Sequence, residues 1–145
     1  MVFRLDVSVV EKASKDVHSA LERLVPQLSP GRSAPSIQDL AEIVARSTLL
    51  IARSDDARIV GTLTLVIHHL PTGLKGRIED VVVDGAARGQ GVGEALTREA
   101  MRLAAEGGVR SVELTSSPTR EAANRLYRRL GFEQRETNVY VWRPL

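Results

Sequence analysis

The segment from Arg77 to Ala105 constrains the fold of this chain more than any other part of the sequence. Its β-branched residues predict a strand over Arg77–Asp84, and the spacing of apolar residues predicts a helix from about Gly91 to Ala105. The loop and the first helical turn carry Arg88, Gly89, Gln90, Gly91, Val92 and Gly93. A helix N-terminus offers unpaired N–H groups and a partial positive charge, and glycines let an anion approach that backbone closely. The segment therefore predicts a phosphate-binding loop, to which Arg88 can add a charge-assisted hydrogen bond.

Residue spacing excludes two common nucleotide-binding motifs at this loop. A P-loop requires Gly-Lys-Ser/Thr after its glycines, whereas Glu94 and Ala95 follow Gly93 here. A dinucleotide-binding fold requires G-x-G-x-x-G and a repeated strand–helix–strand unit early in the chain, and neither is present. The phosphate-bearing ligand therefore belongs to another class.

The other elements predict a mixed sheet with helices on both faces, an α/β (α+β) fold. The chain has 145 residues, which suits a single domain covering residues 1–145. The run Val81, Val82 and Val83 suits burial on both faces, as in the middle of a sheet. We predict an edge strand Phe3–Val9, helices Val10–Leu28 and Ile37–Arg46 (the second capped by Ser36), strands Thr48–Arg53, Arg58–His68 and Val109–Thr115, a helix from Ser117 to Leu130, and a last strand Asn138–Arg143.

Composition excludes several classes of function. The chain lacks cysteine, and its three histidines show no recognised ligand spacing, so we expect no metal site. Aromatic residues make up 3% of the chain, too few for a base-stacking platform. We therefore interpret the arginines of residues 120–129 as a solvated helix face. The alternative is that they bind a phosphate-rich small ligand, and we expect no binding to nucleic acid. No apolar run approaches the about 20 residues that span a bilayer, so we expect a cytoplasmic protein without a membrane partner.

Two motifs identify a family. The run Arg88–Gly93 resembles the R/Q-x-x-G-x-G/A signature of the GNAT superfamily of N-acetyltransferases, and Ala123–Phe132 resembles the A-x-x-L-Y-x-x-x-G-F segment of its last helix. The resemblance covers residues 3 to 143. It implies a mostly antiparallel sheet of six to seven strands with splayed central strands. It also implies acetyl-CoA as the cosubstrate, with its pyrophosphate held by the glycine-rich loop.

The resemblance implies roles for particular residues. The pantetheine arm would enter between strands 77–84 and 109–115 and pair with the backbone of Val81, Val82 and Val83. The N–H of Val81 or Val82 would polarise the acetyl carbonyl. Tyr127 matches the residue that protonates the departing thiolate. Many relatives carry Asn seven residues before this tyrosine, where this chain has Arg120, so either Asn124 or Arg120 would contact CoA.

The general base and the acceptor are less constrained. An alkyl amine has a pKa of about 10, so the site needs a proton acceptor. Glu79 is the first choice because the family often places Glu on this strand, and Asp80 or a water chain remains open. Strand alternation sends the side chains of Glu79 and Asp80 to opposite faces, so both cannot enter one pocket directly. His68 and His69 are weaker candidates for residues at the substrate entrance.

Residues 76–83 resemble the glucosamine-6-phosphate N-acetyltransferases, but residues 115–120 do not. The expected reaction is acetyl transfer to a primary amine of a small molecule or peptide by direct attack in a ternary complex. A non-catalytic acyl-CoA-binding regulatory module on the same fold is the alternative. The family often pairs through its C-terminal strands, and Val139, Tyr140, Val141 and Trp142 would offer apolar surface to a homodimer.

Overall fold

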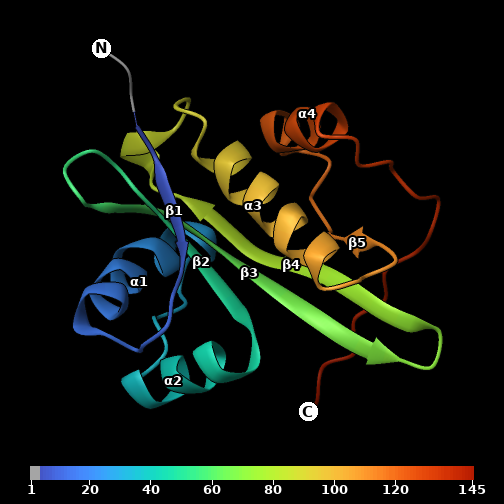
Figure 1. Cartoon of the computed structure of the whole chain (residues 1–145), viewed down its shortest axis with the longest axis horizontal. Helices are drawn as coiled ribbons and strands as arrows, with labels where there is room; N and C mark the ends of the chain where they lie inside the picture. Colours follow the sequence, from blue (N-terminus) through green and yellow to red (C-terminus); the bar gives the residue numbers. More distant parts are fainter. Residues whose placement is uncertain (1–3) are drawn as a thin grey trace. The chain divides into compact units, whose positions relative to one another are not determined.

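The computed structural model describes residues 4–145, which divide into two compact units, one ending at Leu114 and the other beginning at Thr115. The first unit contains a sheet whose strand order follows the chain (Figure 1). The first four strands pair with one another in antiparallel order, and the fifth strand pairs in parallel with the fourth. The strands are β1 (Asp6–Val9), β2 (Thr48–Arg53), β3 (Ile59–Leu70), β4 (Gly73–Val83) and β5 (Val112–Glu113). The predicted mixed, mostly antiparallel sheet is confirmed, but the described residues form five strands rather than six or seven.

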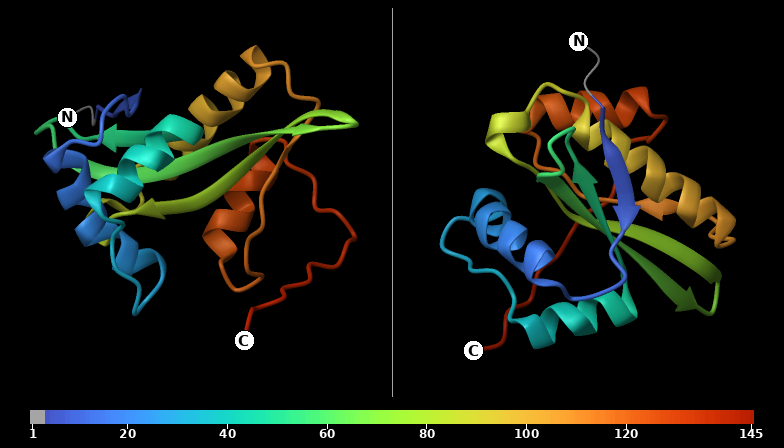
Figure 2. Two further views of the ribbon diagram at one scale, coloured as in Figure 1. Left: turned by 90° about the horizontal axis from the view of Figure 1, so that it is seen from below. Right: turned by 60° about the vertical axis from the view of Figure 1, so that its left-hand side comes forward.

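Three helices cover the sheet of the first unit. Helices α1 (Lys15–Leu28) and α2 (Ile37–Arg46) pack in one cluster with β2, and α3 (Val92–Glu106) lies on the opposite face (Figure 2). The predicted start of α1 at Val10 was wrong, because the Ser14 hydroxyl accepts the Val17 N–H and caps the helix there. The predicted Ser36 cap of α2 is confirmed by a 3.1 Å hydrogen bond from the Asp39 N–H to the Ser36 hydroxyl.

The core forms on both faces of β2. Leu49 and Ile51 join the α1–α2 cluster, and the alternate residues Leu50 and Ala52 are also buried. On the α3 side, a Cβ at Gly61 of β3 would lie only 2.7 Å from Val92 Cγ1. The absence of a side chain at Gly61 therefore lets the first turn of α3 rest directly on the sheet.

Strand β4 contains a bulge at Asp80. Thr64 is opposite Glu79 and Thr62 is opposite Val82, so two residues of β4, Asp80 and Val81, fall opposite one of β3. Asp80 takes the left-handed conformation, with φ +50°. The prediction that the valine run is buried on both faces was right only for Val82, since its two valine neighbours are half-buried. The extra residue bends the strand and breaks its regular alternation.

Strands β4 and β5 are in contact only at one end. Their ladder consists of Gly76 opposite Val112 and Arg77 opposite Glu113. The predicted strand Val109–Thr115 was therefore too long, because a strand persists only where a neighbour supplies its hydrogen bonds. Within the described residues, β4 has no strand neighbour on this side after Arg77. The two strands therefore splay apart, as expected.

The second unit contains helix α4 (Glu121–Arg129) and an irregular tail. The predicted helix start at Ser117 was wrong, because the Arg120 N–H donates to the Ser117 carbonyl at 3.0 Å and closes a turn before the helix. The predicted strand Asn138–Arg143 was also wrong. Its apolar side chains are exposed: Val139 by 68%, Tyr140 by 88%, Val141 by 66% and Trp142 by 84%.

The tail shows why an apolar β-branched pattern alone does not make a strand. Such a pattern indicates a preference for extended backbone. A strand also requires a neighbouring strand to which its backbone can form hydrogen bonds. At the other end of the chain, Phe3 of the predicted first strand lies outside the described residues. The edge strand β1 begins only at Asp6, so the prediction was wrong for Arg4 and Leu5 and confirmed for Asp6–Val9. Among residues 4–145, no helix combines the length and apolarity required to cross a bilayer.

Candidate active site

The glycine-rich loop leads into the N-terminus of α3. After β4 the chain forms a short 3-10 turn, Gly85–Ala87, and the next four residues, 88–91, are exposed. Gly91 occupies the N-cap position with φ +80°, and no side chain caps the helix. A Cβ built at Gly89 or Gly91 would meet no atom within 4 Å. The first amides of α3 therefore have no side-chain cap, and an anion can take the place of such a cap.

A buried carboxylate fixes the start of this loop. Asp84, the residue after β4, is 7% exposed, and its Oδ1 accepts the Ala86 N–H at 3.1 Å. Its Oδ2 lies 2.9 Å from Arg23 Nη1 and 3.6 Å from Arg58 Nη2. The Ala86 N–H lowers the pKa of Asp84 most, and burial opposes this change. The Gln27 side chain and then the two guanidinium groups lower the pKa further. Our sequence reasoning missed Asp84, because its ion-pair partner Arg23 lies 61 residues away in the chain.

The hydrogen bonds of β4 distinguish its valine amides. The Asp84 N–H donates to the Val60 carbonyl of β3 at 2.8 Å. Alternation along an antiparallel ladder directs the Val82 N–H toward β3 as well, and the Val83 N–H toward the open side. Val81 lies in the bulge with Asp80, where this alternation is interrupted.

Two carboxylates lie on β4 near the bulge. Glu79 forms an ion pair with the Nε of Arg77, and its side chain is 44% exposed. Asp80 is exposed. Its left-handed backbone breaks the regular strand alternation from which we predicted that Glu79 and Asp80 point to opposite faces. His68 and His69 are exposed near the far end of the β3–β4 hairpin, opposite residues 75 and 74, whereas Glu79 is opposite residue 64. The structure therefore separates the histidines from Glu79 along the hairpin.

Tyr127 is the buried aromatic residue of α4, with 7% exposure. Its ring meets that of Phe132 edge-on, with the centroids 5.8 Å apart. Burial raises the pKa of Tyr127, and the nearby charge of Arg120 partly opposes that rise. The phenol therefore stays protonated at neutral pH, as a proton donor must.

Two polar side chains of the second unit, Asn124 and Ser116, differ in how their hydrogen bonds are satisfied. Both amide hydrogens of Asn124 are used within its own segment, since Nδ2 donates to the carbonyls of Ser117 and Arg120 at 2.8 Å each. Its Oδ1 therefore remains the atom with which Asn124 could accept a hydrogen bond from a ligand. The Ser116 hydroxyl is buried without a hydrogen-bond partner among the described residues, and no sequence signal had indicated it.

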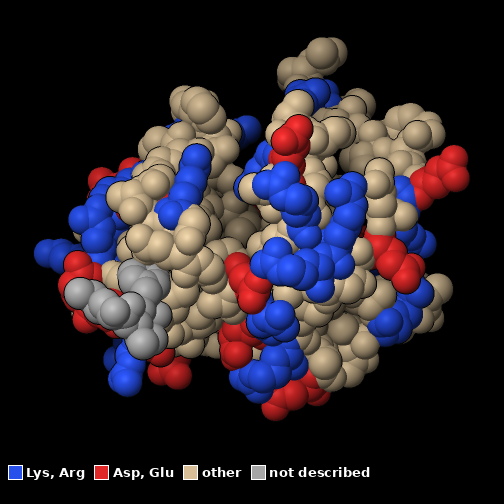
Figure 3. Space-filling view, turned by 90° about the horizontal axis from the view of Figure 1, so that it is seen from above, with Lys and Arg blue, Asp and Glu red and all other residues tan. Residues whose placement is uncertain are grey.

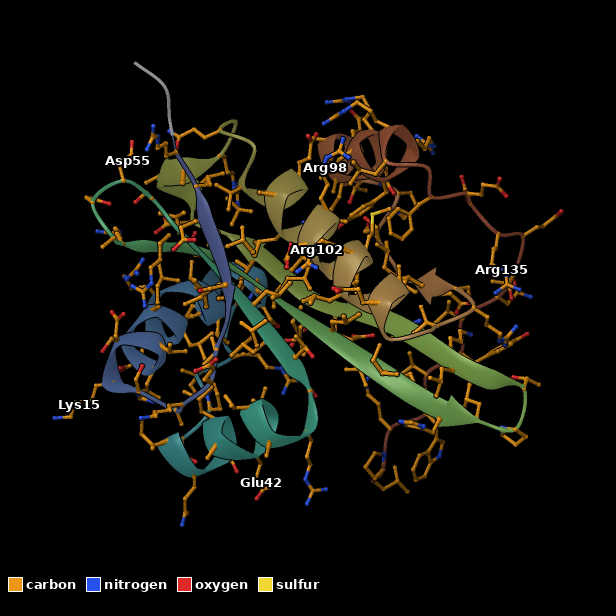
Figure 4. The ribbon with its side chains drawn as sticks, in the orientation of Figure 1. Lys15, Glu42, Asp55, Arg98, Arg102 and Arg135 are labelled. Carbon is orange, nitrogen blue, oxygen red and sulfur yellow. The ribbon has the colours of Figure 1, made fainter. Side chains whose placement is uncertain are left out.

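Charges on the outer face of α3 are balanced locally. Arg98 pairs with Glu94, and Arg102 pairs with Glu99 and Glu106; both arginines project from this helix (Figure 4). Acidic side chains lie among the basic ones over the face shown in Figure 3. In the described part of the chain, no three His, Asp or Glu side chains gather into a metal-ion site.

Comparison with known proteins identifies the class that this fold and loop define. The sequence matches the acetyltransferase (GNAT) family over residues 17–132. The chain belongs to this family and is an acetyl-CoA-dependent N-acetyltransferase. The predicted family and fold are thereby confirmed.

Individual relatives match nearly the whole chain. It is 31% identical to the probable glucosamine 6-phosphate N-acetyltransferase 2 of Oryza sativa subsp. japonica, over 96% of this chain and 85% of that protein. It is 34% identical to the glucosamine 6-phosphate N-acetyltransferase of Trypanosoma brucei brucei, over 93% of each. A crystal structure of a Trypanosoma brucei acetyltransferase has 26% identity and a TM-score of 0.77, covering 95% of this chain and 99% of that one.

Proposed function

We propose that this protein transfers the acetyl group of acetyl-CoA to a primary amine of a small molecule or peptide, by direct attack in a ternary complex. The observation that carries the proposal is the N-terminus of α3, which has no side-chain cap and where a Cβ at Gly91 would enter open space. Acetyl-CoA supplies the activated thioester. The family match spans residues of both compact units, which supports assigning residues 1–145 to one acetyltransferase domain.

Binding of the cofactor falls to the loop and to the open edge of β4. The N–H groups of residues 89–93 would hold the pyrophosphate, and the exposed Arg88 would add its charge. The backbone of β4 from Val81 to Val83 would pair with the pantetheine arm, because this edge has no strand neighbour in the described structure. Ladder alternation turns the Val82 N–H toward β3, which favours Val81 as the donor to the acetyl oxygen.

Proton transfer requires one donor and one acceptor. We assign the donor role to Tyr127, whose raised pKa keeps its phenol protonated until the thiolate leaves. We assign the acceptor role to Glu79, which is half-exposed and adjacent to the open part of β4. Asn124, through its Oδ1, and Arg120 remain the two candidates for a contact with CoA.

Glucosamine 6-phosphate is the first acceptor to test. Two relatives that match at least 93% of this chain carry that substrate in their names. The test is a steady-state assay of CoA release from acetyl-CoA with this aminosugar, glucosamine, polyamines, amino acids and peptide N-termini. We expect turnover with at least one amine. Tight binding of acetyl-CoA with no turnover on any amine would instead indicate a non-catalytic acyl-CoA-binding module.

We also propose a homodimer formed through the C-terminal tail. The apolar side chains of Val139, Tyr140, Val141 and Trp142 are between 66% and 88% exposed. A contiguous set of this kind is unusual on the surface of a soluble monomer.

A further inference from the structure

Helix α1 is tied directly to the start of the glycine-rich loop. Its Arg23 donates from Nη1 to Asp84 Oδ2 at 2.9 Å and from Nη2 to the Ile59 carbonyl at 3.0 Å. One turn later, Gln27 Oε1 accepts the Gly85 N–H at 2.8 Å. Two residues of one helix face therefore hold two successive residues of the loop.

The two helix residues also support each other. Gln27 Nε2 donates to the Arg23 carbonyl at 3.2 Å, so the amide that holds Gly85 is fixed at both ends. Asp84 is nearly inaccessible to water and receives hydrogen bonds on both oxygens. Charge-assisted hydrogen bonds are stronger than neutral ones. Removing one partner of a buried carboxylate leaves part of its charge without compensation, which adds to the cost.

The anchored part of the loop is followed immediately by its exposed part. Ala87 is 5% exposed and ends the fixed turn, whereas residues 88–91 are exposed up to the first residue of α3. A loop that is already ordered loses less conformational entropy when it binds a ligand than one that must be ordered on binding. Contacts that order this part of the loop can therefore change ligand affinity as well as stability.

We propose that Arg23 and Gln27 are positioning residues for the pyrophosphate loop, acting through Asp84 and Gly85, so that α1 sets the affinity for acetyl-CoA. This inference rests on the proposed function, in which the loop binds the pyrophosphate of CoA. Arg23 and Gln27 lie outside the glycine-rich signature, on a helix that precedes the loop by more than fifty residues.

The same helix offers a matched control. Asp16 accepts a hydrogen bond from Arg53 Nη2 at 2.7 Å, which ties the first turn of α1 to β2. This pair connects α1 to the sheet as Arg23 does, but within the described residues it forms no hydrogen bond or ion pair with residues 84–93. Asp16→Asn therefore tests whether a looser α1 is by itself enough to weaken ligand binding.

The experiment measures the dissociation constant of CoA by calorimetry for the full chain, together with urea unfolding of each variant. We expect Arg23→Met and Asp84→Asn to weaken CoA binding about tenfold, which corresponds to one charge-assisted hydrogen bond, and Gln27→Met to weaken it about threefold. Arg23→Lys retains a cation for Asp84 and should bind more tightly than Arg23→Met. Asp16→Asn should stay within twofold of the wild type.

The outcomes separate this inference from the proposed function. If the wild type binds CoA and Arg23→Met and Asp84→Asn bind within twofold of it, the positioning role is overturned. An equal loss of CoA affinity in Asp16→Asn also overturns the positioning role, because it shows that any loosening of α1 weakens binding. If Arg23→Met and Asp84→Asn do not fold, the CoA affinity of Gln27→Met decides. Gln27 is exposed, and its replacement leaves the ion pair between Arg23 and Asp84 in place. A wild type that does not bind CoA refutes the proposed function itself.

Discussion

The ring of Phe132 packs edge-on against the ring of Tyr127, and the Phe132 N–H donates to the Tyr127 carbonyl at 2.9 Å. A second bond runs from the Gly131 N–H to the Arg128 carbonyl at 3.1 Å, and Gly131 has φ +98°. These two bonds and the apolar contact form a Schellman cap. The Gly-Phe pair that marks the family in sequence thus ends α4 and restrains the ring of the proposed proton donor.

Replacing Tyr127 by Phe should lower kcat about 100-fold, because the proton donor is lost, while the ring contact with Phe132 remains. We expect little change in the free energy of unfolding. Steady-state kinetics and urea unfolding measure the two effects. Tyr140→Phe, at an exposed site, is the control and should leave kcat unchanged. A kcat within threefold of the wild type for Tyr127→Phe would exclude the tyrosine as the proton donor.

The substitution Gly91→Asp should abolish CoA binding without unfolding the protein. Its carboxylate would enter the open space before α3 and repel the pyrophosphate, yet Asp is a favourable N-cap residue and tolerates positive φ better than most. Calorimetry with CoA and thermal unfolding test this prediction.

Gly108→Asp is the matched control, since Gly108 shares the φ of +80° and open surroundings but follows the other end of α3. Unchanged CoA affinity in Gly91→Asp would remove the loop from the binding site. Equal losses of affinity in both variants would show that strain rather than charge at the loop is responsible.

Glu79→Gln should reduce kcat about 100-fold if Glu79 accepts the proton of the amine, and Asp80→Asn should reduce it less than threefold. The paired variants are informative because both residues lie at the same bulge. The measurement is steady-state kinetics of each variant with a saturating amine. A larger effect in Asp80→Asn would transfer the role to Asp80, and small effects in both would favour a water chain.

Asp84 should stabilise the fold above pH 4 and lose this contribution in acid. Its folded-state pKa is lowered, chiefly by the Ala86 N–H, so the contribution is complete above the unfolded pKa of about 3.9 and disappears as pH falls through the folded value. We expect Asp84→Asn to cost about 2 kcal/mol at pH 7. Urea unfolding from pH 7 to pH 2.5 should show the difference from wild type shrinking below pH 4. A difference that does not depend on pH would contradict the assignment.

The proposed homodimer predicts that the polar substitutions Tyr140→Ser and Trp142→Ser together shift the protein toward the monomer. Removal of two large apolar side chains reduces the area that a partner copy can bury. Sedimentation velocity across a concentration series measures the shift. A monomeric wild type at all concentrations would rule out the dimer.

Local sequence signals predicted two elements to the residue. Helix α2 begins and ends where the Ser36 cap and the apolar spacing place it, and β2 matches its predicted range. The starts of α1 and α4 were predicted less accurately. The Ser14 hydroxyl caps α1 after its predicted start, and a backbone turn closed by the Ser117 carbonyl delays the start of α4. The bulge at Asp80 was not predicted, since it arises from the register between β3 and β4.

The sequence by itself determined the family, the uncapped glycine loop and the Gly-Phe cap of α4, because each of these depends on residues a few positions apart. Only the tertiary structure decided how far β5 follows β4, which valine amides face β3, and which helix anchors the loop. These features depend on backbone pairing and on partners such as Arg23 and Asp84, which are distant in the chain. Gly91 leaves the N-terminus of α3 without a side-chain cap, and the contacts of Asp84 hold the first residues of the loop in place.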